Sequence, residues 1–144
     1  MKIDFKKGDG LVPVIIQNSN TFQVLMLGYM NEEAFLTTKK TKKVVFYSRS
    51  KERLWKKGET SGNELLVKNI LTDCDSDTIL IFALPKGPTC HKGNISCFDN
   101  DTNVGFIYSL ENIIKEKENE TSKESYTKYL LEKGTKHIAR KVGE

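Results

Sequence analysis

Three cysteines and three aspartates carry the metal-binding chemistry of this chain, and they fall within one short window. Asp73, Asp75 and Asp77 alternate around Cys74, and the other two cysteines follow within the next 25 positions. Thiolates suit soft or borderline ions such as zinc, whereas carboxylates suit hard ions such as magnesium. Two kinds of ligand packed this closely predict a reaction centre more than a structural scaffold.

The aspartates favour a divalent cation other than calcium. In an extended segment, residues two apart point the same way, so the three carboxylates would share one side while Cys74 faces the other. A calcium loop counted from Asp73 needs Gly at its sixth position and Glu at its twelfth, but Thr78 and Leu84 stand there. The alternative that the residues leave open is an acidic turn between two strands.

Cys90 and Cys97 flank Gly93, with His91 beside the first of them. This spacing does not match the tight cysteine pairs of zinc fingers or ribbons. Three protein ligands plus water form the catalytic arrangement, in which zinc lowers the pKa of the water to ~7. His91 is then a candidate proton shuttle or fourth ligand. The alternative is that the cysteines are small core residues, because free cysteine is often buried.

A polar loop over residues 48–63 predicts a second site. Arginine forks and backbone amides near glycine suit phosphate oxygens. A solvated basic loop is the alternative that charge alone favours. The residues that we expect to contact substrate are Ser48, Arg49, Ser50, Lys51, Arg53, Trp55, Lys57, Glu59, Thr60 and Ser61.

The bulk properties are those of a soluble protein with one main domain. The chain has 144 residues, with 38% hydrophobic and 29% charged residues and a formal net charge of +4. That excess is too small to predict nucleic-acid binding, but it favours a phosphorylated substrate. No apolar run approaches the ~20 residues of a membrane span, and the amino terminus lacks a signal-peptide core. We therefore expect a cytoplasmic protein whose three cysteines stay reduced.

The hydrophobic pattern predicts strands first and helices last. That order favours an α+β fold, a mainly antiparallel sheet domain with one or two helices followed by a short helical C-terminal segment. The predicted elements are a hairpin of residues 12–17 and 22–27, a helix from Asn31 to about 40, strands over 43–47, 64–72 and 78–84, and helical stretches over 109–120 and 126–142, joined by a linker over 120–124.

At these residues the sequence resembles phosphoribosyl-AMP cyclohydrolase. The resemblance covers roughly residues 8–100. Lys92 and Leu65 depart from the residues that the family often has, and both lie outside the proposed ligands. The matching segments are residues 28–34 (GYMNEEA), 47–50 (YSRS), 54–62 (LWKKGETSG), 73–77 (DCDSD) and 90–98 (CHKGNISCF).

The resemblance implies a metal arrangement and a reaction. It implies magnesium at the three aspartates and zinc at the three cysteines, in an intertwined homodimer where Cys74 of one chain joins Cys90 and Cys97 of the other. It implies that a zinc-activated water attacks C6 of the adenine ring of phosphoribosyl-AMP, so that the C6–N1 bond opens in histidine biosynthesis. His91 would move the proton.

The tail resembles the start of phosphoribosyl-ATP pyrophosphohydrolase, which is often fused behind the cyclohydrolase. The resemblance implies a cyclohydrolase domain over residues 1–104 and an incomplete pyrophosphohydrolase segment over 105–144. Only Glu144 matches that family's carboxylate cluster, so we expect no pyrophosphohydrolase activity from this chain.

Two alternatives come from other classes. A zinc-stabilised nucleic-acid-binding module would use the basic loop as its contact surface, but the three aspartates would repel a phosphate backbone. A zinc purine deaminase would pair His-x-Glu with Cys-x-x-Cys, and neither motif occurs here. We therefore expect a small-molecule substrate, no nucleic acid and no membrane as partners.

Overall fold

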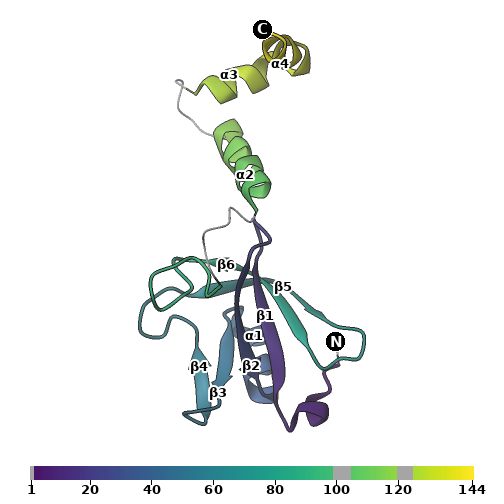
Figure 1. The fold of residues 1–144 in the computed structure, drawn as a ribbon, viewed down its shortest axis with the longest axis vertical. Helices are drawn as coiled ribbons and strands as arrows, with labels where there is room; N and C mark the ends of the chain where they lie inside the picture. Colours follow the sequence, from purple (N-terminus) through teal and green to yellow (C-terminus); the bar gives the residue numbers. More distant parts are fainter. Residues whose placement is uncertain (1, 99–104, 120–124) are drawn as a thin grey trace. The chain divides into compact units, whose positions relative to one another are not determined.

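The computed structural model describes residues 2–98, 105–119 and 125–144. Its contacts divide the chain into two compact units, Met1–Val104 and Gly105–Glu144. In the described residues, strands and a helix make up the first unit and helices make up the second (Figure 1). The predicted α+β class is confirmed. The homodimer and the pyrophosphohydrolase character of the second unit stay predictions.

The predicted first hairpin and the helix after it are both present. Strands β1 (Val12–Asn18) and β2 (Val24–Met30) pair antiparallel. The Asn18 side chain closes their turn by accepting two backbone amides at 2.8 and 3.3 Å. Helix α1 (Glu32–Thr41) follows, and the Asn31 side chain accepts a first-turn amide at 2.8 Å. This bond satisfies an N–H group that has no partner within the helix.

The two later strands complete a four-stranded sheet. Strands β5 (Leu65–Thr72) and β6 (Ile79–Pro85) pair antiparallel, as predicted. Strand β6 also pairs with β1 in parallel, so the strand order is β2-β1-β6-β5. The first and last strands of unit 1 therefore lie side by side at the centre of the sheet.

The prediction of one continuous loop over residues 48–63 is wrong at its centre. Strands β3 (Val45–Ser48) and β4 (Arg53–Lys56) form a separate two-stranded sheet. The charged ends of β4 hide its apolar centre from pattern analysis. Trp55 is opposite Phe46 in the register, their ring centroids are 5.6 Å apart, and Trp55 packs against the core. The burial of Trp55 thus overrides the polar composition.

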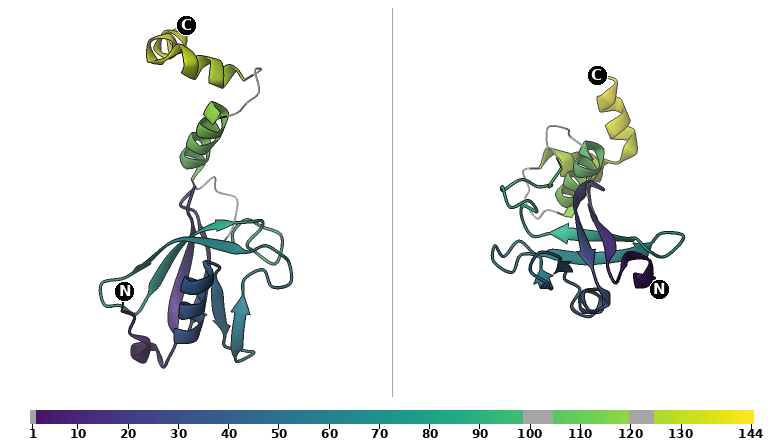
Figure 2. Two further views of the ribbon diagram at one scale, coloured as in Figure 1. Left: turned by 180° about the vertical axis from the view of Figure 1, so that it is seen from behind. Right: turned by 60° about the horizontal axis from the view of Figure 1, so that its bottom comes forward.

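One face of the large sheet forms the core beneath α1 and the β3–β4 pair (Figure 2). Val14 and Ile81 are fully buried on this face, and Phe46 is 1% exposed. Gly28 of β2 lies under the Phe46 ring, where an added Cβ would come within 2.5 Å of ring carbons. The glycine therefore lets the small sheet pack closely on the large one.

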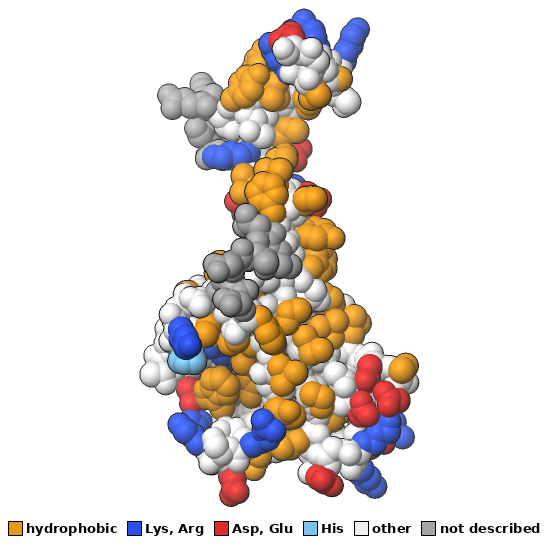
Figure 3. Space-filling view, viewed as in Figure 1, with side chains coloured by type: hydrophobic (Ala, Val, Ile, Leu, Met, Phe, Trp, Pro, Cys, Tyr) orange, Lys and Arg blue, Asp and Glu red, His pale blue; other side chains and the backbone are white. Residues whose placement is uncertain are grey.

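The opposite face of the sheet is also apolar. Leu27, Ile15, Leu80 and Leu71 form a row in register across all four strands. Leu27 is 46% and Leu71 is 44% exposed. The space-filling view shows hydrophobic side chains gathered over this sheet (Figure 3). An exposed apolar patch of this kind is typical of a surface that meets another protein.

Unit 2 holds α2 (Phe106–Asn119), α3 (Tyr126–Lys133) and α4 (Thr135–Val142). The helical stretch predicted over 126–142 is divided at Gly134, which has φ 78° and donates its N–H to two carbonyls of α3. Glycine takes this left-handed conformation easily, so the helix ends there. The linker predicted over 120–124 lies outside the described residues. Nowhere in the described ranges is a helix both long and apolar enough to cross a bilayer.

The carboxylate of Glu64 ties the small sheet to the large one. Its side chain is 11% exposed, and its oxygens lie 2.9 Å from Lys43, 3.1 Å from Lys56 and 3.1 Å from Lys86. These lysines come from before β3, from the end of β4 and from just after β6. Hydrogen bonds from the three ammonium groups, Lys43 first, lower the pKa of Glu64 to about 2.

We predict that Glu64→Gln destabilises unit 1 near neutral pH and less so in acid. Because the pKa of Glu64 is lower in the folded than in the unfolded chain, its stabilisation is present above about pH 4.5 and is lost as pH falls toward about 2. Urea unfolding followed by fluorescence of Trp55, the only tryptophan, measures this loss. The control is Glu52→Gln, which removes an exposed carboxylate. If the difference in the free energy of unfolding between wild type and Glu64→Gln stays constant on acidification, the prediction is contradicted.

Candidate metal and substrate site

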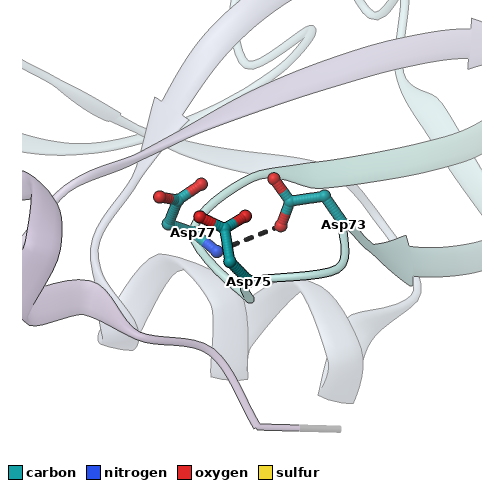
Figure 4. A group of neighbouring side chains, drawn as sticks. All are labelled: Asp73, Asp75 and Asp77. Atoms are coloured by element: carbon teal, nitrogen blue, oxygen red, sulfur yellow. Dashed lines mark hydrogen bonds between the residues drawn. The ribbon is translucent and has the colours of Figure 1, made fainter.

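Asp73, Asp75 and Asp77 lie in the turn between β5 and β6, and each offers an oxygen within 4.8 Å of the others (Figure 4). The segment is therefore the acidic turn between two strands that the sequence left open, and not an extended segment. Ser76 has φ 64°, and Asp73 Oδ1 accepts the amides of Asp77 and Thr78, each at 3.1 Å. An aspartate that accepts amides of its own turn stabilises that turn. The carboxylates are therefore gathered by a turn and not by strand alternation.

The electrostatics of this turn favour the ionised form of Asp73. Burial by itself raises the pKa of Asp73, but hydrogen bonds from Thr78 and Asp77 outweigh it and lower the pKa. Lys7 Nζ lies 2.8 Å from Asp75 Oδ2 and 3.4 Å from Asp77 Oδ2. The hydrogen bond to Asp75 is the main cause that raises the pKa of Lys7. Sequence reasoning missed Lys7, because it is 68 positions from Asp75 and no local pattern joins them.

The three thiols do not gather within one chain. Cys74 is exposed in the acidic turn, whereas Cys90 and Cys97 lie in the loop after β6. Among the described residues, the three aspartates are the only group of three or more His, Cys, Asp or Glu residues whose ligand atoms lie within 4.8 Å of one another. The described part of one chain therefore does not form a centre of three thiols.

The loop after β6 folds back so that Cys90 and Cys97 become neighbours. Cys90 makes backbone hydrogen bonds of 2.9 and 3.0 Å across a tight turn, and Cys97 N donates to Leu25 O on β2 at 2.8 Å. Burial raises the pKa of the Cys97 thiol, the nearby Cys90 raises it further, and Lys57 lowers it. A cation bound between the two sulfurs would offset the part of this shift that comes from Cys90, because only the thiolate form binds metal.

The donor sets fit two different ions. Adjacent sulfurs match a soft or borderline ion such as zinc, and three clustered carboxylates match a hard ion such as magnesium. The carboxylates are drawn together by backbone bonds within their own turn. The sulfurs are drawn together by the attachment of their loop to β2. Each donor set is thus positioned by the fold before any ion binds.

His91 lines a cavity of about 330 Å³ next to the cysteine loop. Its Nδ1 atom lies 4.0 Å from Cys90 Sγ, and the side chain is exposed. The cavity lies between the loop after β4 and the loop after β6. Its lining residues are Trp55, Lys57, Gly58, Glu59, Thr60, Ser61, Asn63, Pro88, Cys90, His91 and Gly93. A group bound there would be held by both loops, beside the thiol and the imidazole.

A second cavity, of about 340 Å³, shares Trp55, Glu59 and Thr60 with the first. It is also lined by Ser48, Lys51 and Arg53. The Arg53 guanidinium donates to both Glu59 oxygens, at 2.6 and 3.2 Å. This fork lowers the pKa of Glu59 and raises that of Arg53. The ion pair joins the end of the β3–β4 pair to the loop after β4.

Eight of the ten predicted substrate residues line these cavities. The exceptions are Arg49 and Ser50, which are both exposed. Arg49 instead stacks on Tyr29, 3.8 Å from the ring centroid. Sequence reasoning missed Asn63 and Pro88 as lining residues. The only sequence signal for them is the neighbouring glycines Gly62 and Gly87, which allow two loops to approach closely.

Comparisons with known proteins agree on one family. The family model described as "Phosphoribosyl-AMP cyclohydrolase" matches residues 26–99. The "Histidine biosynthesis bifunctional protein HisIE" of Vibrio cholerae is 50% identical over 147 residues, covering 99% of this chain and 70% of that protein. Proteins of the same name from Xanthomonas campestris pv. campestris and Escherichia coli K12 are 54% and 52% identical, with 99% of this chain and 68% and 71% of theirs covered.

We predict that Gly58→Ala destabilises unit 1 more than Gly62→Ala. Both glycines have positive φ, 85° and 75°, which costs an alanine about 1 kcal/mol. A Cβ on Gly58 would also lie 2.6 Å from the Asn63 backbone, whereas nothing lies within 4 Å at Gly62. Overpacking adds about 1–3 kcal/mol. Urea unfolding followed by Trp55 fluorescence measures the difference, and equal losses would show that the Asn63 backbone does not pack closely against Gly58.

Proposed function

Because this chain belongs to the phosphoribosyl-AMP cyclohydrolase family, we propose that it hydrolyses the C6–N1 bond of the adenine ring in 1-(5-phosphoribosyl)-AMP. The chain is a hydrolase of histidine biosynthesis. The observation that carries the finer proposal is the cavity between the loop after β4 and the loop with Cys90 and His91. This cavity brings the polar loop after β4 next to the Cys90 thiol and the His91 imidazole.

The chemistry follows from the substrate. A ribosyl group on N1 withdraws electrons from the ring, so C6 becomes electrophilic. Water adds its oxygen to C6, the C6–N1 bond breaks, N1 leaves with a proton, and the exocyclic nitrogen stays on C6. When bound, zinc supplies a Lewis acid that lowers the pKa of water to ~7. His91 is the group that we expect to move the proton toward N1, because it lines the cavity beside Cys90.

Cys90 and Cys97 would hold the zinc from one chain, and Cys74 of a second copy would complete the set. The separation of the thiols within one chain supports this sharing. The apolar row of Ile15, Leu27, Leu71 and Leu80 also supports it, because a second copy would cover that face. The thiols are free, and the cytoplasm that we propose as the location would keep them reduced.

The second cavity is the proposed phosphate subsite. Lys51 and Arg53 provide positive charge there, and Ser48 and Thr60 provide hydroxyl groups. Glu59 holds the Arg53 guanidinium in one orientation. Arg53 would therefore lose less side-chain entropy when phosphate binds. The Asp73, Asp75 and Asp77 carboxylates would hold magnesium, which when bound supplies positive charge for a phosphate or for water.

We predict that Cys97→Ser abolishes ring opening and zinc retention while the fold is kept. The serine side chain replaces a soft thiolate with a neutral hydroxyl, and Cys97 reaches the sheet through its backbone. An ultraviolet assay of ring opening, elemental zinc analysis and Trp55 fluorescence measure the three properties. Chelator added to wild type should have the same effect on activity. Full activity in zinc-free Cys97→Ser protein would remove the basis of the proposal.

A mixing experiment tests the sharing of the zinc site. We predict that Cys74→Ser and Cys97→Ser proteins, each inactive alone, regain activity when unfolded and refolded together. Random pairing makes about half of the dimers mixed, and each mixed dimer has one intact site of two, so about a quarter of wild-type activity should return. Co-refolding of Cys90→Ser with Cys97→Ser is the matched control and should restore nothing, since both substitutions affect the same half-site. Equal recovery in both mixtures would exclude this arrangement.

A further inference from the structure

The acidic turn between β5 and β6 already holds a cation that belongs to this chain. Lys7 Nζ donates to Asp75 Oδ2 at 2.8 Å and to the Asp75 backbone carbonyl at 3.1 Å. It also lies 3.4 Å from Asp77 Oδ2. Three oxygens of the turn thus surround one ammonium group. No sequence motif predicts this contact, because Lys7 and Asp75 are 68 positions apart.

The Lys7 ammonium is brought there by an anchored segment. Lys7 belongs to the 3-10 helix η1 (Phe5–Gly8). The Asp4 carboxylate caps that helix by accepting the Lys6 amide at 3.0 Å, and Asp4 N donates to Ser76 O at 2.7 Å. The backbone bond fixes η1 beside the turn, so the ammonium group is positioned by more than its own ion pairs.

A divalent cation on the aspartates would draw on two of the same carboxylates. Asp75 and Asp77 supply two of the three clustered carboxylates, and their Oδ2 atoms are the ones that face Lys7. A dication and an ammonium group in contact with the same two oxygens would repel each other strongly at that distance. One must therefore leave when the other binds.

We propose that Lys7 is a tethered competitor for the metal site, so that a divalent cation binds the acidic turn only by displacing the Lys7 ammonium. This inference rests on the magnesium site proposed above and adds a residue that sets its affinity. It means that metal occupancy and the position of η1 are coupled. It also means that the turn is charge-compensated when no divalent ion is bound, which keeps three neighbouring carboxylates from repelling one another.

The test is a direct titration with Mn²⁺, in which electron paramagnetic resonance measures the free ion in zinc-loaded protein at low salt. Lys7→Met should bind Mn²⁺ about three- to tenfold more tightly than wild type, because a like charge is removed from a partly exposed site. Lys6→Met is the matched control. It removes the same charge from the same short helix, and should change the affinity less than about twofold.

A second measurement uses the unchanged protein. If Mn²⁺ displaces Lys7, an amine-reactive reagent should modify Lys7 faster with the ion than without it, while modification of Lys6 stays the same. Mass spectrometry of the labelled peptides gives both rates. Trp55 fluorescence verifies that the variants are folded.

The failure of this inference differs from the failure of the magnesium site. Mn²⁺ binding that is lost in Asp75→Asn but equal in wild type, Lys6→Met and Lys7→Met would overturn the role of Lys7 and keep the site. Binding that is unaffected by Asp75→Asn would overturn both. Tighter binding in Lys7→Met alone, with faster labelling of Lys7 in the presence of the ion, supports the proposal.

Discussion

The almost fully buried carboxylate of Glu64 is the constraint on which the position of the site depends. It lies just before β5 and binds lysines from just before β3, from the end of β4 and from the segment after β6. The loop after β4 and the loop after β6 leave from two of those points and together form the cavity with His91. A buried charge without these partners would be costly. The ion pairs therefore keep both loops in a fixed position relative to the sheet.

The two donor sets follow different physical rules. The aspartates are gathered locally, because Asp73 accepts the amides of its own turn. Cys90 and Cys97 are gathered by tertiary structure, because the backbone of Cys97 bonds to the edge strand β2. Cys74 belongs to the acidic turn and not to the cysteine loop. One chain thus offers the parts of a centre without closing it, and in the homodimer proposed above the Cys74 of a second copy would close it.

Charge compensation recurs across unit 1. Glu64 is balanced by three lysines, Glu59 by Arg53, and the acidic turn by Lys7. Of these, the Glu64 carboxylate is the most enclosed, so leaving it without its partners would cost the most stability. The Arg53–Glu59 and Lys7–Asp75 pairs are more exposed, and such pairs contribute little to stability. Their significance lies in the orientation of groups that an anionic substrate or a cation would contact.

The sequence by itself determined the local features: the β1–β2 hairpin, the Asn31 cap of α1, the strands β5 and β6, and the two kinds of metal donor. These follow from periodicity, from side chains that satisfy nearby amides, and from the chemistry of sulfur and oxygen. Only the tertiary structure decided that Trp55 belongs to a strand, that Cys74 is apart from the other thiols, and that Lys7 contacts the acidic turn. Each of those outcomes depends on groups far apart in the chain. Burial of Trp55 against the core and the parallel pairing of β1 with β6 are long-range contacts, and no spacing within a local segment encodes them.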